Sequence, residues 1–227
     1  MAISSPTELF TPGTSNSSKI NHSSGAFTPG AGDLVIIAAA VRETSGGGSA
    51  PSMTISQTHG EAWSWTKITR SNGDGNAHTL SLWYAVAPSG AGEGVVTVEA
   101  DEACNRWEVV GVGVSGASGA IVNFNSAESA SGSPSITLPS APASTSVVLG
   151  FIASVGDSDG VTPGASFTEI SESSGTSTTL QAQFDETSPG ATCDWSGAAT
   201  ASNLMIALEI VAPASGGGDV AAMMMAA

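Results

Sequence analysis

Few residues of this 227-residue chain have the types and spacing that catalysis requires. A hydrolytic nucleophile needs a Ser or Cys beside a positioned base, but the sequence has no G-x-S-x-G turn. Its three histidines, His22, His59 and His78, lie in no catalytic motif. We interpret them as solvated turn residues. We therefore predict no catalytic residue and no enzymatic activity.

Metal and cofactor sites are weakly indicated. Cys104 and Cys193 form no C-x-x-C pair and no H-E-x-x-H pattern occurs, so we predict no metal and no cofactor. Two cysteines are too few for a disulfide framework, and we expect buried free thiols, with a disulfide as the open alternative. Asp157-Ser-Asp159-Gly160 and Asn72-Gly-Asp-Gly-Asn76 resemble parts of calcium loops but lack the downstream Glu. We expect turns at both places, with calcium binding as the alternative.

Carbohydrate chemistry is a third possibility. The spacing of a glycosidase carboxylate pair is set by the fold and is not visible in the sequence, and we interpret Asp101-Glu102 as a charged turn. Trp63 and Trp65 share one face of a predicted strand, and Trp83 lies on a later strand. Exposed tryptophans can stack on sugar rings. Packing in the core or between subunits is the interpretation that we favour for them.

The composition excludes several classes of function. Five Lys and Arg against 20 Asp and Glu give a net charge of −15, and only 11% of the residues are charged. Nucleic-acid grooves and polybasic membrane surfaces need clustered cations, whereas the basic residues occur singly in the sequence, so we expect neither partner. The longest apolar run, Leu34 to Val41, is too short to span a bilayer, and no signal peptide is evident.

The elements that would position these residues are β-strands. Runs of β-branched and aromatic residues with period-two alternation, separated by Gly, Pro, Ser and Thr, predict about a dozen strands. Leu34 to Val41 is expected to be a buried central strand. A weak repeat aligns Thr79–Tyr84 with Thr179–Phe184 and Trp65–Ile68 with Phe167–Ile170. We predict an all-β antiparallel β-sandwich, a jelly-roll-like double Greek key with weak internal duplication.

The chain is expected to divide into three parts. Residues 1–17 form an N-terminal arm, residues 18–212 one β-sandwich domain with pseudo-halves of about 18–117 and 118–212, and residues 213–227 a Gly-rich linker with an apolar tail. The tail ends in Val-Ala-Ala-Met-Met-Met-Ala-Ala. An uncovered apolar tail risks aggregation, and Met adapts to irregular grooves. We therefore predict that Val220, Met223, Met224 and Met225 dock on a partner.

Residues 18–212 resemble a family of β-sandwich proteins found in tailed-phage virions and prophage regions. The resemblance is carried by strand patterns and by no chemical signature, so it transfers no site residue. These patterns are Leu34-Val-Ile-Ile-Ala-Ala-Ala-Val41, Trp63-Ser-Trp-Thr-Lys-Ile68, Leu80-Ser-Leu-Trp-Tyr-Ala85, Arg106-Trp-Glu-Val-Val110, Val114-Ser-Gly-Ala117 and Ala207-Leu-Glu-Ile-Val211.

The resemblance implies a non-enzymatic structural protein, made in the host cytoplasm and located in the virion. A capsid decoration or cement protein is the expectation, with a tail-fibre, receptor-binding or carbohydrate-binding module as the alternative. Its partners would be other virion proteins such as the major capsid protein, and further copies of itself, most simply as a trimer. The low charge density agrees, because a Ser-, Thr- and Gly-rich surface loses little when neighbours cover it.

Overall fold

The computed structural model describes residues 3–43, 49–72, 77–117, 121–130, 132–156, 160–198 and 202–212. Within these ranges it contains 17 β-strands and no helix, and all strand pairs are antiparallel. The predicted all-β antiparallel sandwich is therefore confirmed. No helix in the described ranges is long and apolar enough to cross a membrane.

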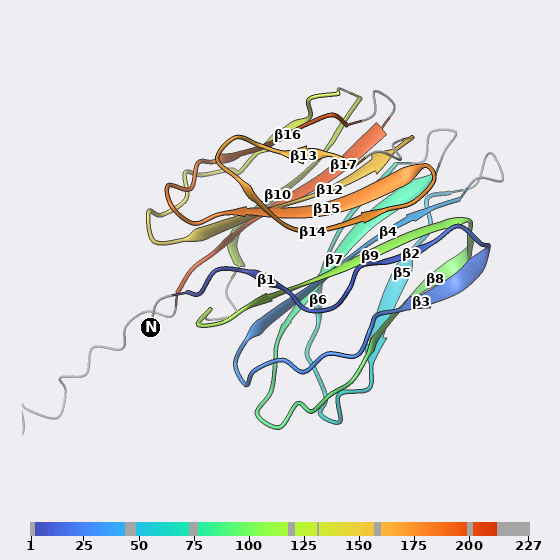
Figure 1. Ribbon diagram of the computed structural model, residues 1–227, viewed down its shortest axis with the longest axis horizontal. Helices are drawn as coiled ribbons and strands as arrows, with labels where there is room; N and C mark the ends of the chain where they lie inside the picture. The colour runs from blue at the N-terminus through green and yellow to red at the C-terminus, as the bar shows by residue number, and fades with distance from the viewer. Residues whose placement is uncertain are drawn as a thin grey trace, which may run out of the picture.

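The strands form four sheets (Figure 1). The first inner sheet has the order β1 (Thr7–Glu8), β9 (Arg106–Val114), β4 (Leu34–Arg42), β7 (His78–Val86) and β6 (Thr66–Asn72), with β2 (Gly13–Ser15) also on β9. The second inner sheet has the order β10 (Ile121–Ser129), β17 (Ser202–Ile210), β12 (Val147–Val155), β15 (Thr178–Asp185) and β14 (Thr168–Ser174).

Two smaller sheets cover the outer faces of the inner pair. The first outer sheet has the order β3 (Lys19–Ser23), β8 (Val96–Cys104) and β5 (Met53–Gln57). The second outer sheet has the order β11 (Ser135–Thr137), β16 (Thr192–Ser196) and β13 (Thr162–Pro163). The result is a stack of four β layers with three apolar cores between them.

The alternation of side chains on β4 explains why its sequence is apolar without a break. Leu34, Ile36 and Ala38 belong to the core between the two inner sheets. Val35 and Ile37 belong to the core beneath the first outer sheet. A strand that is buried on both faces needs apolar residues at every position. The prediction of a buried central strand is confirmed.

The two halves of the chain repeat one strand order, in agreement with the predicted duplication. In the second half, β10 to β17 can be numbered from first to eighth in chain order. The second inner sheet then has the order first, eighth, third, sixth, fifth, and the second outer sheet has the order second, seventh, fourth. The strands β1–β9 follow the same order, with β1 and β2 sharing the first place. One double Greek key spread over both halves was predicted, but each half builds its own pair of sheets. The jelly-roll detail stays a prediction.

Three local expectations differ from the structure. The predicted arm includes β1 and β2, which pair with β9 because its edge is otherwise open. The strand that was predicted to carry Trp63 and Trp65 begins only at Thr66, so both tryptophans precede it. Asp101 and Glu102 lie inside β8 and not in a turn, because inward-facing Ala100 and Cys104 keep that strand extended over its core.

Candidate protein-contact site

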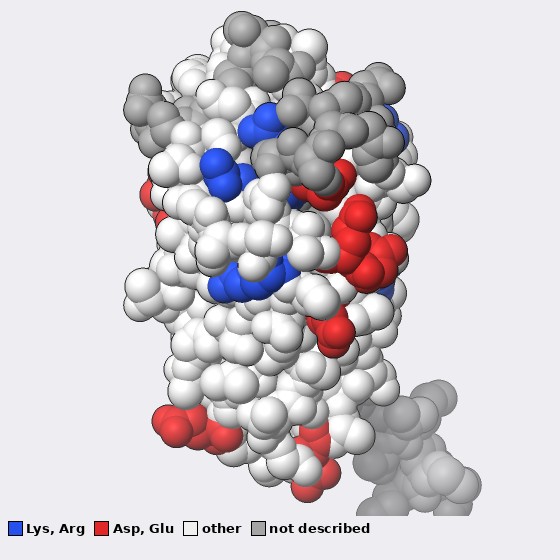
Figure 2. Space-filling view, turned by 90° about the vertical axis from the view of Figure 1, so that its right-hand side faces the viewer, with Lys and Arg blue, Asp and Glu red and all other residues white. Residues whose placement is uncertain are grey.

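The basic side chains do not form a continuous surface. Two of them meet: Arg42 lies opposite Arg106 in the β4–β9 pair, and both donate to Ser177 Oγ, at 3.4 and 3.1 Å. On the face shown in Figure 2, the Lys and Arg atoms form small separate patches with acidic side chains beside them. This distribution gives no track of cations for a phosphate backbone on that face.

Two buried glutamates tie parts of the fold together. Glu108 on β9 is fully buried and accepts hydrogen bonds from Thr14 Oγ1 at 3.0 Å and from Ser173 Oγ. Burial raises the pKa of its carboxyl to about 7, against the lowering effect of these two donors and of Arg106. Since Thr14 is on β2 and Ser173 on β14, this carboxyl joins the two halves.

For Glu209 on β17, the hydrogen bonds together have a larger effect on the pKa than burial has. Burial raises its pKa, but three donated hydrogen bonds outweigh this effect and leave the pKa below its ordinary value. The donors are Ser146 Oγ at 2.6 Å, the Ala143 backbone N–H at 2.8 Å and Asn123 Nδ2 at 3.2 Å. Through these bonds Glu209 attaches two segments to β17, namely the residues just before β12 and the start of β10. It is a structural residue.

The histidines are not solvated turn residues, so that interpretation is wrong. His59 is buried, with its ring 4.5 Å from the Phe27 ring and 5.0 Å from the Trp63 ring. His78 is also buried, and its Nε2 lies 3.2 Å from Ser202 Oγ. His22 is partly buried and its Nδ1 lies 2.8 Å from Lys19 Nζ. Burial, together with the Lys19 charge, lowers the His22 pKa to about 4.

The tryptophans mostly pack in the cores. Trp83, Trp107 and Trp195 are at most 3% exposed, so none of them can present a ring to a sugar. Trp63 and Trp65 are partly exposed and stack on one another, with centroids 5.1 Å apart and ring planes 23° apart. Each ring thus covers one face of the other. Both also pack against the core beneath the first outer sheet, so the core interpretation holds fully for three of the five and in part for these two.

The cysteines lie on opposite sides of the molecule. Cys104 belongs to the core under the first outer sheet and Cys193 to the core under the second. Both are buried free thiols, as expected, and burial raises both pKa values to about 12. They are unreactive at neutral pH for that reason.

Several predicted positions fall outside the described residues. They are Asp157 and Asp159, residues 73–76 of the other loop, and the tail positions Val220, Met223, Met224 and Met225. Among the residues that the structure describes, no group of three or more His, Cys, Asp and Glu is arranged to hold a metal ion.

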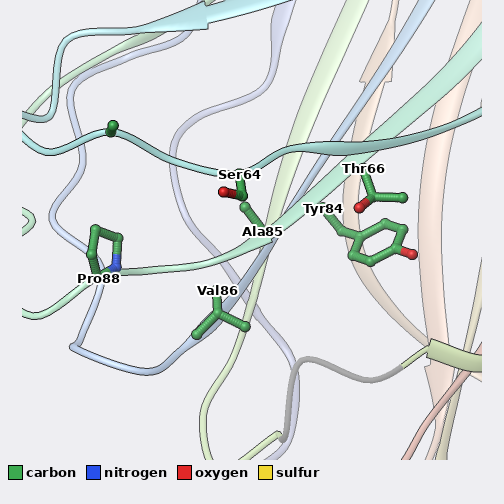
Figure 3. Close-up of a pocket in the computed structure, with 7 residues that line it drawn as sticks. Ser64, Thr66, Tyr84, Ala85, Val86 and Pro88 are labelled. Carbon is green, nitrogen blue, oxygen red and sulfur yellow. The ribbon is translucent and has the colours of Figure 1, made fainter.

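A shallow hollow lies where the end of β7 faces the segment that precedes β6 (Figure 3). Its volume is about 370 Å³. It is lined by Ala62, Ser64, Thr66, Tyr84, Ala85, Val86 and Pro88. Ser64, Thr66 and Tyr84 contribute hydroxyl groups, but none of the lining residues is an acid, a cation, a histidine or a cysteine, so the lining offers no group that acts as a base at neutral pH. The hollow is uncharged, with an aromatic ring and aliphatic surface beside these hydroxyls.

The second surface feature is the edge strand β10, which was not singled out from the sequence. Val122 and Phe124 on this strand are 56% and 51% exposed. Phe124 lies opposite Leu208, which belongs to the core between the inner sheets, and opposite residues of paired strands share one face of the sheet. Phe124 is therefore on the core-facing side of the second inner sheet, but at its edge, where the core does not cover it. Large apolar side chains at this exposure on a strand edge are unusual unless another chain covers them.

The edge strands β6 and β14 of the inner sheets are better protected than β10 against pairing with a strand of another chain. β6 carries Lys67 and Arg70, and β14 carries Glu169 and Glu172. Charged side chains on an edge discourage pairing with another strand. β10 has no charge before Glu128, near its end. Its residues 121–127 are therefore the least protected long edge among the described strands, and they form the candidate contact site.

Comparison of the chain with protein-family models, with curated proteins and with solved structures gives no match.

Proposed function

We propose that this protein is a non-enzymatic structural subunit of a phage virion, most specifically a capsid decoration protein that stabilises the shell through subunit contacts. The observation that carries the proposal is the uncharged edge of β10 with Val122 and Phe124 exposed. Such an edge pairs with a strand from another chain, and its apolar side chains then become buried. The partners are the major capsid protein and further copies of this chain, most simply as a trimer.

The cores and the surface support this proposal. Three apolar cores between four layers give a closely packed body. A surface of Ser, Thr and Gly with a net charge of −15 suits the outside of a shell, because it is repelled by the phosphates of packaged DNA. The buried ionisable groups Glu108 and Glu209 hold strands together and line no described hollow.

Removing the protein from its virion is expected to lower the temperature and the osmotic shock at which the shell releases DNA. Purified wild-type protein should restore the tolerance, and so should an Ile20→Lys variant, whose change lies on exposed β3. A Phe124→Lys variant should not restore it, because a Lys on the edge opposes strand pairing. Unchanged tolerance without the protein would rule out the cement role.

The alternative, a tail-fibre or carbohydrate-binding module, has one supporting observation. Trp63 and Trp65 are partly exposed, and Trp65 keeps one ring face that Trp63 does not cover, whereas Trp63 also has the His59 ring 5.0 Å away. Sugar rings stack on such faces. Binding on a glycan array that is lost in Trp65→Ala would favour this alternative over the decoration role.

A further inference from the structure

The hollow at the end of β7 is uncharged and partly lined by apolar surface, and the chain itself carries an uncharged, apolar segment. We propose that the C-terminal tip, residues 220–227, docks in this hollow on its own subunit. The sequence predicts a docking partner for this tip, and the hollow would provide the surface. This docking does not depend on a place in the virion.

The lining of the hollow and the tip match in their chemistry. Tyr84, Val86 and Pro88 supply an aromatic ring and aliphatic surface, and the lining has no carboxylate and no cation. Met sulfur makes favourable contacts with aromatic rings. Residues 220–227 contain three Met and no charged side chain, in a chain whose net charge is −15. A segment that entered the hollow with a carboxylate would meet hydroxyl donors but no cation to offset the hydration that its charge loses.

The described chain ends near the same end of the core as the hollow. β7 and β17 are both nine residues long, and their first residues adjoin, with His78 Nε2 3.2 Å from Ser202 Oγ. Both strands then run along the core between the inner sheets, so their last residues, Val86 and Ile210, lie toward the same end of it. Val86 lines the hollow and is 44% exposed, and the described chain continues from Ile210 only to Ala212.

The tip is within reach of the hollow's end of the molecule. Seven residues separate Ala212 from Val220, and the eight Cα–Cα steps of this Gly-rich stretch give a root-mean-square span of about 16 Å and an extended limit of about 28 Å. A tip on a short linker meets a surface at the same end of its own subunit at an effective concentration in the millimolar range. The same tip on a second copy would meet it only at the bulk protein concentration. Docking on the same subunit is favoured for this reason.

Methyl NMR of the full chain with ¹³C-methyl Met tests the proposal directly. Met53 and Met205 are buried and serve as internal references for an intact fold. In the wild type, at least one methyl of Met223, Met224 or Met225 should show cross-relaxation to the ring of Tyr84, the one tyrosine of the chain. Deleting residues 220–227 should shift the Tyr84 ring signals.

A pair of matched variants gives the control. Val86→Asp should return the tail methyls to the positions of unstructured Met while Met53 and Met205 stay unchanged. Ile20→Asp, at a site of similar exposure on β3, should leave all five methyls in place. Tail methyls at free-Met positions in the wild type would overturn the proposal. So would contacts to Tyr84 that disappear on dilution, because they would assign the hollow to the tail of a second copy.

Discussion

Truncating Phe151 to alanine is expected to lower the free energy of unfolding by about 3–5 kcal/mol. Phe151 lies on β12, the central strand of the second inner sheet, and its side chain is fully buried in the core between the inner sheets. Deleting the ring leaves a cavity that the neighbouring β layers cannot close. Denaturant or thermal unfolding measures the loss.

The exposed Phe124 provides the matched control for this substitution. Phe124→Ala should lower the unfolding free energy of the monomer by only about 1 kcal/mol, since half of its surface is already in water. Because the inner core is built by both halves, calorimetry of Phe151→Ala should show one transition shifted as a whole. Two transitions, of which only one moves, would show that the halves fold independently.

The second large effect is a loss of stability with rising pH that originates at Glu108. Its pKa is about 7 in the folded protein and near 4.5 when unfolded. Below pH 4.5 the carboxyl is protonated in both states. Between pH 4.5 and 7 only the unfolded state releases the proton, so stability falls across this window and is constant above it. This difference in pKa corresponds to a loss of about 3 kcal/mol in the free energy of unfolding.

Glu108→Gln removes the ionisation and should therefore be more stable than the wild type at pH 8, by up to about 3 kcal/mol. The gain should shrink to zero or reverse near pH 4.5, where the wild-type carboxyl is neutral. Unfolding free energies measured at both pH values check this. A pH-independent difference between the two proteins would contradict the raised pKa.

Glu209→Gln should behave in the opposite way, which makes it a useful comparison. The folded pKa of Glu209 is lowered, so its carboxylate contributes stability above the unfolded pKa. This contribution is lost as the pH falls through the folded pKa. The variant should therefore be less stable than the wild type at pH 7, with a difference that diminishes under acidic conditions.

Much of the fold could be predicted from the sequence because period-two alternation and turn residues are local signals. The unbroken apolar run of β4 shows that both faces of that strand are covered. The repeat between Thr79–Tyr84 and Thr179–Phe184 corresponds to β7 and β15, which hold equivalent places in the two inner sheets.

What the sequence could not provide is the neighbour of each strand. Val122 and Phe124 alternate like any half-buried strand, and only the sheet order shows that β10 is an edge. His59 and His78 follow polar stretches, which suggested solvated turns, but tertiary packing against Phe27 and Ser202 buries them. The partition into four sheets depends on long-range pairing that a single sequence does not specify.

Sedimentation velocity tests most directly whether β10 is a contact edge. The wild-type chain is expected to sediment as a homo-oligomer, a trimer in the simplest case, at tens of micromolar (about the range of weak subunit contacts). Phe124→Lys should shift it to the monomer, whereas Ile20→Lys should not. A wild-type chain that stays monomeric, or an oligomer that Phe124→Lys leaves intact, would contradict the role proposed for this edge.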